Sequence, residues 1–351
     1  MVTNTTSSDG DKNGALEMPT PSRAPVVDLS PWFEGSLRGR QRVADLVGEA
    51  VSTGFLQVIG HGISAKLRGD ALAAMSAFFP LDTAIKEQMV PTDGAYRGWT
   101  RRRSEGFAAT LQQLAPADLV EGFVMGAEDR ANENPGDPAF APNLWPDEEF
   151  HQAMWSYYLA ARALSEELCE IFAMALQVEA DFFTGRIDHA NVTMRANYYE
   201  RREQDGDLSA AQMALGAHSD YGIVTVLLAD PGPGLQVVSS EGEWFDLEPA
   251  DDALIINVGD AMALLTNDLW PSTIHRVVPT EGLLHRPRRS IAMFQDGNPD
   301  ATISCLAQCI SRQRPARYEP TTLGAHVAAK VESSRTQVPA RTQQTTAGRL
   351  G

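Results

Sequence analysis

Apolar residues between positions 150 and 175 recur at alternating steps of four and three. This spacing is typical of one face of an α-helix with 3.6 residues per turn. The positions concerned are Phe150, Met154, Tyr157, Ala161, Leu164, Leu168, Ile171 and Ala175. Residues 36–53 also have helical spacing, and VVDL (Val26–Leu29) and GFLQVIGHGI on either side of them have the pattern of strands and a turn. We expect the long helix to pack against a sheet.

From Asn191 onward the chain changes to short apolar segments separated by Gly, Pro and Asp. These segments are NVTMRANYY, GIVTVLLAD, GLQVV, EWFDL, ALIINVGD, AMALLT, STIHRVV and RSIAMFQD. Many short strands punctuated by turns favour a barrel or jelly roll with helices on its outside. The predicted fold class is therefore mainly β with flanking helices.

The two ends of the chain differ in composition from the rest. Residues 1–24 and 333–351 are poor in apolar residues and rich in polar ones, a composition typical of disordered tails. Between them we expect one domain over 25–332, with a helical and mixed part to about residue 190 and a jelly-roll core over about 191–310. A division into two domains near residue 190 is disfavoured, because the N-terminal half lacks an obvious core of its own.

Charge and composition narrow the possible partners. Lys and Arg number 29 against 46 Asp and Glu, and the net charge of −17 opposes both phosphate backbones and anionic lipid surfaces. No apolar run approaches the roughly 18 residues of a membrane span, and the N-terminus lacks the apolar stretch of a signal peptide. We expect a cytoplasmic protein without nucleic-acid or membrane partners. Its cysteines, Cys169, Cys305 and Cys309, do not suggest a disulfide framework.

Two ionisable residues precede one of the buried strands, in the segment AHSDYGIVTVLL. In an extended chain His218 and Asp220 point to the same side, which suits metal chelation, although a structural histidine–carboxylate hydrogen bond would use the same pair. A second strand-like segment, STIHRVV, brings His275 fifty-seven residues after His218. Two histidines and one carboxylate form a facial triad that suits Fe(II) and leaves three octahedral positions open. In RRSIAMF, Arg288 and Ser290 share one face of a further strand.

Together these residues resemble the isopenicillin N synthase-like family of 2-oxoglutarate- and Fe(II)-dependent dioxygenases. That family has the pattern His-x-Asp, some fifty residues, His, and then Arg-x-Ser about a dozen positions further on. The resemblance covers most of residues 25–330, because other family segments occur in the expected order. These segments are PVVDLS, GFLQVIGHGI, DLVEGF, NLWP, MRANYY, GLQV, NVGD and LLTND.

The resemblance implies a double-stranded β-helix with Fe(II) held by His218, Asp220 and His275. It implies that the distal carboxylate of 2-oxoglutarate meets Arg288 and Ser290, whose guanidinium and hydroxyl suit a carboxylate. Further hydrogen bonds to this cosubstrate are expected from Asn197 and Tyr199, the last two positions of the Arg-x-Asn-x-Tyr pattern. The reaction implied consumes dioxygen, releases succinate and CO2, and oxidises a C–H bond of a small organic molecule, such as a secondary metabolite. Hydroxylation is the common outcome, and desaturation or cyclisation are variants.

Some features fit the family less well or carry no motif. Glu200 stands where the family usually has proline, and His285 lies in a slightly long insert before Arg288. We expect His285 at the surface, His61 in turn hydrogen bonds, and surface or structural roles for the other histidines outside the triad. These are His151, His189 and His326.

The segment YRGWTRRRSEGF, residues 96–107, concentrates four arginines in an acidic protein. We favour a solvated loop, although Arg97 and Arg101–Arg103 could also meet an anionic substrate, and the aromatic residues of the segment an apolar one. Two other functions remain open at this stage: an Fe(II)/O2 oxidase that does not use 2-oxoglutarate, and a non-catalytic metal-binding jelly roll. The sequence leaves the substrate, the position of oxidation and the oligomeric state open.

Overall fold

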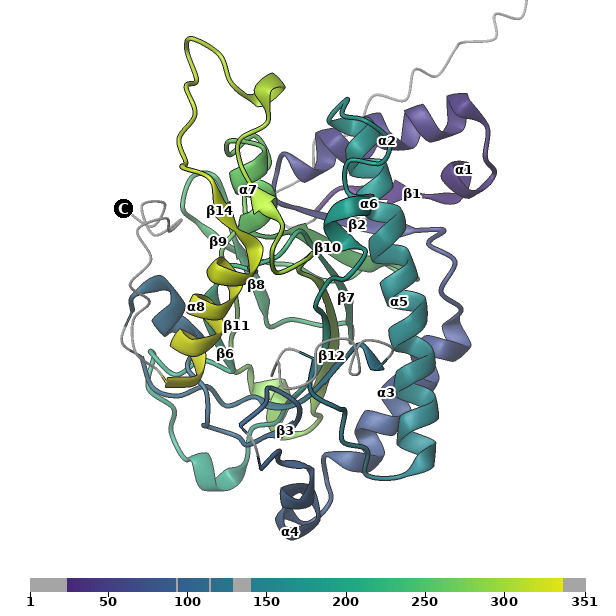
Figure 1. Ribbon diagram of the computed structural model, residues 1–351. Coiled ribbons are helices and arrows are strands. Elements are labelled where there is room, and N and C mark those ends of the chain that lie inside the picture. The colour runs from purple at the N-terminus through teal and green to yellow at the C-terminus, as the bar shows by residue number, and fades with distance from the viewer. Residues whose placement is uncertain (1–23, 93, 114, 129–139, 337–351) are drawn as a thin grey trace, which may run out of the picture.

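The computed structural model describes residues 24–92, 94–113, 115–128 and 140–336. Figure 1 shows two β-sheets at the centre, with long helices along one side and a C-terminal helix on the other. The N-terminal half carries the elements β1 (Val26–Asp28), α1 (Ser30–Phe33), α2 (Leu37–Val51), β2 (Phe55–Ile59), α3 (Ala65–Phe78), α4 (Thr83–Lys86), β3 (Gly98–Thr100), β4 (Glu121–Gly126), α5 (Glu148–Ala175) and α6 (Thr184–Ile187).

The second half carries most of the core strands. Its elements are β5 (Val192–Tyr199), β6 (Leu215–His218), β7 (Val224–Ala229), β8 (Leu235–Val238), β9 (Trp244–Asp246), β10 (Leu254–Val258), α7 (Asp260–Leu265), β11 (His275–Val277), β12 (Arg288–Gln295), β13 (Thr302–Ile303), β14 (Thr321–Thr322) and α8 (Leu323–Thr336). Short 3-10 helices lie at η1 (Glu87–Met89), η2 (Phe107–Leu111), η5 (Glu203–Asp205), η6 (Glu281–Leu284) and η7 (Ala307–Cys309).

Two facing sheets form the predicted jelly roll. The larger has the strand order β1-β2-β10-β7-β12-β5-β4-β3, and the smaller has the order β6-β11-β8-β9. Neighbours in the core of both sheets are mostly far apart in sequence, as in β12, which pairs antiparallel with both β5 and β7. Strands β1 to β4 extend the large sheet with residues from the N-terminal half. The fold is thus mainly β with flanking helices, as predicted.

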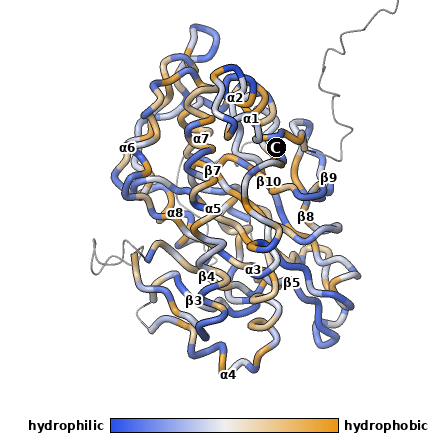
Figure 2. Tube along the Cα trace, turned by 90° about the vertical axis from the view of Figure 1, so that its right-hand side faces the viewer, coloured by the Kyte–Doolittle hydropathy of each residue, from blue (hydrophilic) through white to orange (hydrophobic). Residues whose placement is uncertain are grey.

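Helix α5 runs along the outside of the large sheet, as the four-and-three spacing predicts. Its N-cap residue is Asp147, whose side chain accepts a hydrogen bond from the Phe150 backbone N–H, and Glu148 and Glu149 lie in the first turn. Every predicted face residue from Phe150 to Ile171 is buried. Hydrophobic and hydrophilic residues alternate along the turns of α5 in Figure 2, which is the pattern of a helix with one face against a core.

One predicted strand is wrong. The segment AMALLT lies in helix α7, which starts after Gly259 and runs from Asp260 to Leu265. All six residues of α7 are buried, so the segment shows no polar face from which helical and strand periodicity could be told apart. Alanine, methionine and leucine favour the helix intrinsically.

The predicted tail boundaries also need correction. Residues 333–336 form the last turn of α8, and Ser333 and Ser334 are buried, so the C-terminal boundary predicted at residue 333 lies too early. At the other end Ala24 is buried in the core between the sheets. The remaining residues of both predicted tails lie outside the described part of the chain. Within the described residues, no helix is long and apolar enough to cross a membrane.

Candidate functional site

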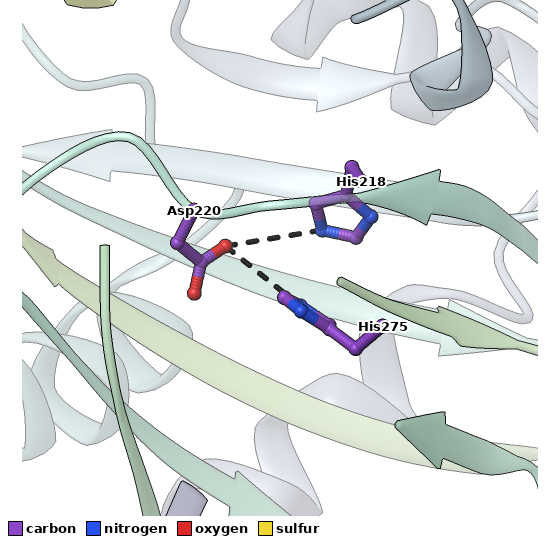
Figure 3. A group of neighbouring side chains, drawn as sticks. All are labelled: His218, Asp220 and His275. Carbon is purple, nitrogen blue, oxygen red and sulfur yellow. Dashed lines mark ion pairs between the residues drawn. The ribbon is translucent and has the colours of Figure 1, made fainter. Parts of the chain in front are cut away.

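The three predicted metal ligands come together where the small sheet meets the loop that leads to β7. His218 is the last residue of β6 and His275 the first of β11, and the two residues are direct cross-strand partners. Asp220 follows two residues beyond β6, and its Oδ1 lies 3.8 Å from the Nε2 atoms of both histidines. Figure 3 shows the three side chains pointing toward one another. All three are buried, and their potential ligand atoms lie within 4.8 Å of one another.

Hydrogen bonds orient each of these side chains. His218 Nδ1 lies 2.8 Å from the Gly216 carbonyl oxygen and His275 Nδ1 lies 3.1 Å from that of Thr273, so each Nδ1–H donates to backbone and each Nε2 faces inward with its lone pair. Thr225 Oγ1 and Asn257 Nδ2 both donate to Asp220 Oδ2, each at 2.6 Å. The other carboxylate oxygen therefore remains available beside the two imidazoles.

The electrostatics of the triad suit a cation. Burial, followed by the neighbouring His275, holds the pKa of His218 below its usual range, so the imidazole is neutral at pH 7. A neutral imidazole is the form that binds metal. Two imidazole nitrogens and one hard carboxylate on one face form a donor set that fits Fe(II) and leaves room for further ligands.

A second group of side chains lies on the paired strands β5 and β12. Arg288 is directly opposite Tyr199, and Ser290 is directly opposite Asn197. Tyr199 and Ser290 share a side-chain hydrogen bond, and the Arg288 guanidinium lies 5.8 Å from the centre of the Tyr199 ring.

The Arg288 guanidinium has unmet hydrogen-bonding capacity. Arg288 is buried, and its Nε and Nη2 have no hydrogen-bond partner. Burial also lowers its pKa, because the charge is removed from water without a close counter-ion. A buried, unpaired guanidinium is costly, and a carboxylate that entered beside it would restore the missing hydrogen bonds.

The neighbouring Arg289 lies on the opposite face of β12. Its Nε and Nη2 each lie 2.9 Å from a different oxygen of Asp230, and its Nη1 donates to Ser76 Oγ and the Leu72 carbonyl on α3. Strand alternation therefore separates the two arginines. Arg288, which shares a face with Ser290 as predicted, has open donors, and Arg289 joins the sheet to a helix.

A cavity of about 540 Å³ opens next to the triad. His218 and Asp220 form part of its wall, and the rest combines apolar side chains with a few polar groups. Among the latter, Arg195 pairs with Glu105 at 2.7 Å and bonds to the Tyr96 hydroxyl, so its charge is neutralised within the wall. A cavity beside a metal-type triad is suited to a small organic molecule.

Comparisons with known proteins agree with this geometry. Residues 190–296 match the family model of the 2OG-Fe(II) oxygenase superfamily, and residues 24–148 match that of the N-terminal region of non-haem dioxygenases in morphine synthesis. The chain is 31% identical over 315 residues to a 2-oxoglutarate-Fe(II) type oxidoreductase, hxnY, of Emericella nidulans, in a match that covers 86% of this chain and 88% of the relative. The chain belongs to the 2-oxoglutarate–Fe(II) oxygenase superfamily.

Further relatives of this oxygenase place it among enzymes. It is 32% identical to the Validamycin A dioxygenase of Streptomyces hygroscopicus subsp. limoneus, over 81% of this chain and 79% of the relative. A full-length Neurospora crassa protein, solved in complex with alpha-KG and thymine, superposes with a TM-score of 0.76 at 26% identity, and the match covers 88% of this chain and 96% of that chain. The protein is an oxidoreductase that uses Fe(II), 2-oxoglutarate and dioxygen.

The arginine-rich segment of the oxygenase is not the solvated loop that we favoured. Residues 98–100 form strand β3, Tyr96 and Phe107 line the cavity, and Arg97 is buried. Arg102 is largely buried in an ion pair with Asp205. Tyr96 and Phe107 flank the four arginines, and their place in the wall agrees with the alternative that the aromatic residues of this segment face a substrate.

Helix α8 closes one side of the oxygenase cavity, and the sequence did not predict this helix. Val327 and Val331 line the cavity from α8, while His326 and Lys330 reach the buried Asp260 on α7, at 3.3 and 3.2 Å. His326 thus has a structural role, which is one of the two roles expected for it. The weak amphipathic pattern of α8 gave little sign of this role.

The other histidines of the oxygenase agree with expectation. His61 accepts a hydrogen bond from the Ile63 N–H and contacts the Asp252 carbonyl, as expected of a turn histidine. His285 is exposed, His189 lies at the surface between Asp188 and Asp300, and His151 stacks on Trp145. The three cysteines form no disulfide.

Proposed function

We propose that this oxygenase oxidises a C–H bond of a small organic molecule, most simply by hydroxylation, with Fe(II) held by His218, Asp220 and His275. The observation that carries the proposal is the convergence of these three side chains beside a cavity of about 540 Å³. When bound, the iron supplies the oxidising chemistry: one oxygen atom of O2 enters the substrate as hydroxyl, and the other enters succinate as 2-oxoglutarate loses CO2.

We propose that 2-oxoglutarate lies between the triad and the Arg288 group. The unpaired Arg288 donors would take the distal carboxylate, with the Ser290 hydroxyl beside them. Asn197 and Tyr199 face this pair from β5, and Asn197 is itself oriented by the Arg195 Nε–H, which donates to its Oδ1 at 2.6 Å. These buried contacts would fix the cosubstrate and exclude water from it.

The bonds to Asp220 would keep its coordinating oxygen in place during turnover. Thr225 and Asn257 both donate to Oδ2, so rotation of the carboxylate would break two hydrogen bonds. The hydrogen bonds from His218 Nδ1 and His275 Nδ1 to backbone carbonyl oxygens likewise hold the two imidazole rings in place. The residues of the chain thus orient the reactants, and the pocket wall determines which C–H bond is presented.

Family membership favours this reading over the two alternatives, an oxidase without 2-oxoglutarate and a non-catalytic jelly roll. A cytoplasmic setting is part of the proposal, and the net charge of −17 argues against nucleic-acid or membrane partners.

Succinate release tests the function directly. Anaerobically purified, Fe(II)-loaded protein receives 2-oxoglutarate, O2 and a mixture of small metabolites, and succinate and new +16 Da products are measured by mass spectrometry. Asp220→Ala should lower iron binding and succinate release by roughly 100-fold or more, since even outer contacts of a metal site contribute 10–100-fold. The fold should survive. Unchanged iron content and turnover in the variant would refute the triad, and absence of succinate with bound iron would refute the use of 2-oxoglutarate.

A further inference from the structure

The wall of the cavity contains a carboxylate that the reaction described above does not use. Asp296 follows the last residue of β12, lines the cavity and is only 8% exposed. Among the described residues, no hydrogen bond or ion pair engages its carboxylate. Burial, followed by the negative charge of Asp220, raises its pKa to about 7. A buried carboxylate without a partner is costly, so its presence in a cavity wall requires an explanation.

The position of Asp296 next to the metal site depends on a glycine. Gly222 lies two residues beyond Asp220, and a Cβ at this position would lie 2.3 Å from Asp296 Oδ1. The missing side chain at Gly222 therefore lets the carboxylate pack against the backbone of the triad loop. A substrate group held by Asp296 would thus lie near the oxidising centre.

The other charges of the wall do not compensate Asp296. Arg195 is ion-paired with Glu105, and Lys330, which is not among the residues that line the cavity, is ion-paired with Asp260. The guanidinium of Arg97 packs against the backbone of Gly126 on β4, and Arg335 is exposed on α8. None of these cations is among the groups that shift the pKa of Asp296. Among the described residues, the carboxyl group of Asp296 in the cavity wall therefore lacks a positive counterpart.

A second inward polar group lies in the same wall. The hydroxyl of Tyr221 is buried and has no hydrogen-bond partner in the described structure. The remaining inner surface is largely apolar, with Phe107 from η2, Phe294 from β12 and Val327 and Val331 from α8. The ligand that fits has an apolar body and a polar group that can satisfy both a carboxylate and a phenol.

We propose that Asp296 binds a positively charged nitrogen of the primary substrate, so that the oxygenase acts on small amines with an apolar body. The proposal rests on the proposed function only in taking this cavity as the substrate site. A protonated amine supplies charge and N–H donors to the carboxylate, and its N–H groups are also the type of donor that the unpaired Tyr221 hydroxyl can accept. An anionic substrate would be repelled by Asp296, which argues against the acidic ligand that the arginine-rich segment suggested.

Binding of matched probes tests the proposal without turnover. Full-length protein loaded with Fe(II) and 2-oxoglutarate is titrated anaerobically with benzylamine, benzyl alcohol and benzoate, and the titration is repeated on metal-free protein. Benzylamine should bind at least about tenfold more tightly than benzyl alcohol, which corresponds to about 1.4 kcal/mol, and benzoate should bind most weakly. Measurements on the wild-type protein are sufficient to overturn the proposal: it is wrong if benzylamine and benzyl alcohol bind equally, or if benzoate is preferred.

Two variants locate the effect. Asp296→Asn keeps the shape of the side chain and removes its charge, so the preference for benzylamine should disappear while the affinity for benzyl alcohol stays the same. Glu332→Gln removes an exposed acid from the cavity mouth and should leave the preference intact. Loss of the preference in Glu332→Gln, or its persistence in folded Asp296→Asn, would overturn the assignment. The titration of metal-free protein requires neither bound iron nor succinate release. Its result is therefore independent of the outcome for the proposed function.

Discussion

Arg288 and Arg289 are adjacent in sequence and have different surroundings. Arg288 faces Tyr199 within the core and has two nitrogens without partners, whereas Arg289 is bound by Asp230 and by α3. The difference follows from strand alternation, which sends neighbouring side chains to opposite faces of β12. A guanidinium group is therefore available to bind a ligand at Arg288, whereas at Arg289 it stabilises the fold.

Substitution of each arginine by methionine should separate these roles. Arg288→Met should raise the apparent constant for 2-oxoglutarate by roughly 100-fold or more, because loss of one partner of a buried charge pair costs about 3–5 kcal/mol. Arg289→Met should change this constant little and instead lower thermal stability, because it breaks the bonds to Asp230 and α3. Steady-state kinetics in 2-oxoglutarate and melting curves check both variants. A large effect of Arg289→Met on the constant, with a small one for Arg288→Met, would reverse the assignment.

Among the elements, α8 connects the end of the described chain to the centre of the molecule. Asp260 on α7 holds both His326 and Lys330 of α8, and Lys330 is fully buried. Gly106, just before η2, also donates its N–H to the Ser334 carbonyl near the end of the helix. The helix is thus fixed at several points while its apolar side chains line the cavity.

Removal of the Asp260 charge should loosen α8. Asp260→Asn leaves Lys330 buried beside a neutral amide, and breaking a buried pair in this way costs about 3–5 kcal/mol. Asp70→Asn is the matched control, because it breaks the exposed Lys66–Asp70 pair, which contributes about 0–1 kcal/mol. Thermal melts and limited proteolysis of both variants at pH 7 check the prediction. Equal melting temperatures for the two variants, with α8 resistant to protease in both, would contradict it.

For the molecule as a whole, the two sheets lie between the long helices on one side and α8 on the other (Figure 1). The residues that line the cavity beside the triad come from distant parts of the chain. The apolar core runs from Val27 on β1 to Leu323 at the start of α8, so both halves of the sequence share it. This continuity supports one domain rather than a division near residue 190.

Deletion of residues 1–20 and 338–351 should leave both thermal stability and turnover nearly unchanged. The low apolar content of these segments cannot stabilise an ordered structure by burial, and the core already includes residues from Ala24 onward. Melting curves and succinate release from the doubly truncated protein, compared with the full chain, measure the effect. A clear drop in turnover with an unchanged melting temperature would mean that one of the ends reaches the site.

The sequence by itself determined the features that depend on local periodicity and spacing. The steps of four and three located α5, and the strand pattern placed Ser290 and Arg288 on one face. Such features follow from backbone geometry, which repeats every 3.6 residues in a helix and every two in a strand. The triad of His218, Asp220 and His275 was indicated by the family resemblance. The structure buries the predicted face of α5 and brings the three triad side chains together, and their role as metal ligands stays a prediction.

Only the tertiary structure decided what lies opposite each face. The buried segment of α7 showed no period, so packing and not pattern made it a helix. Asp296 and Tyr221 belong to no motif, and both line the cavity because the end of β12 packs against the triad loop at Gly222. Lys330, in the same way, is an ordinary helical lysine until α7 places Asp260 beside it. Periodicity fixes the direction of a side chain, whereas its partner depends on contacts between residues that are distant in sequence.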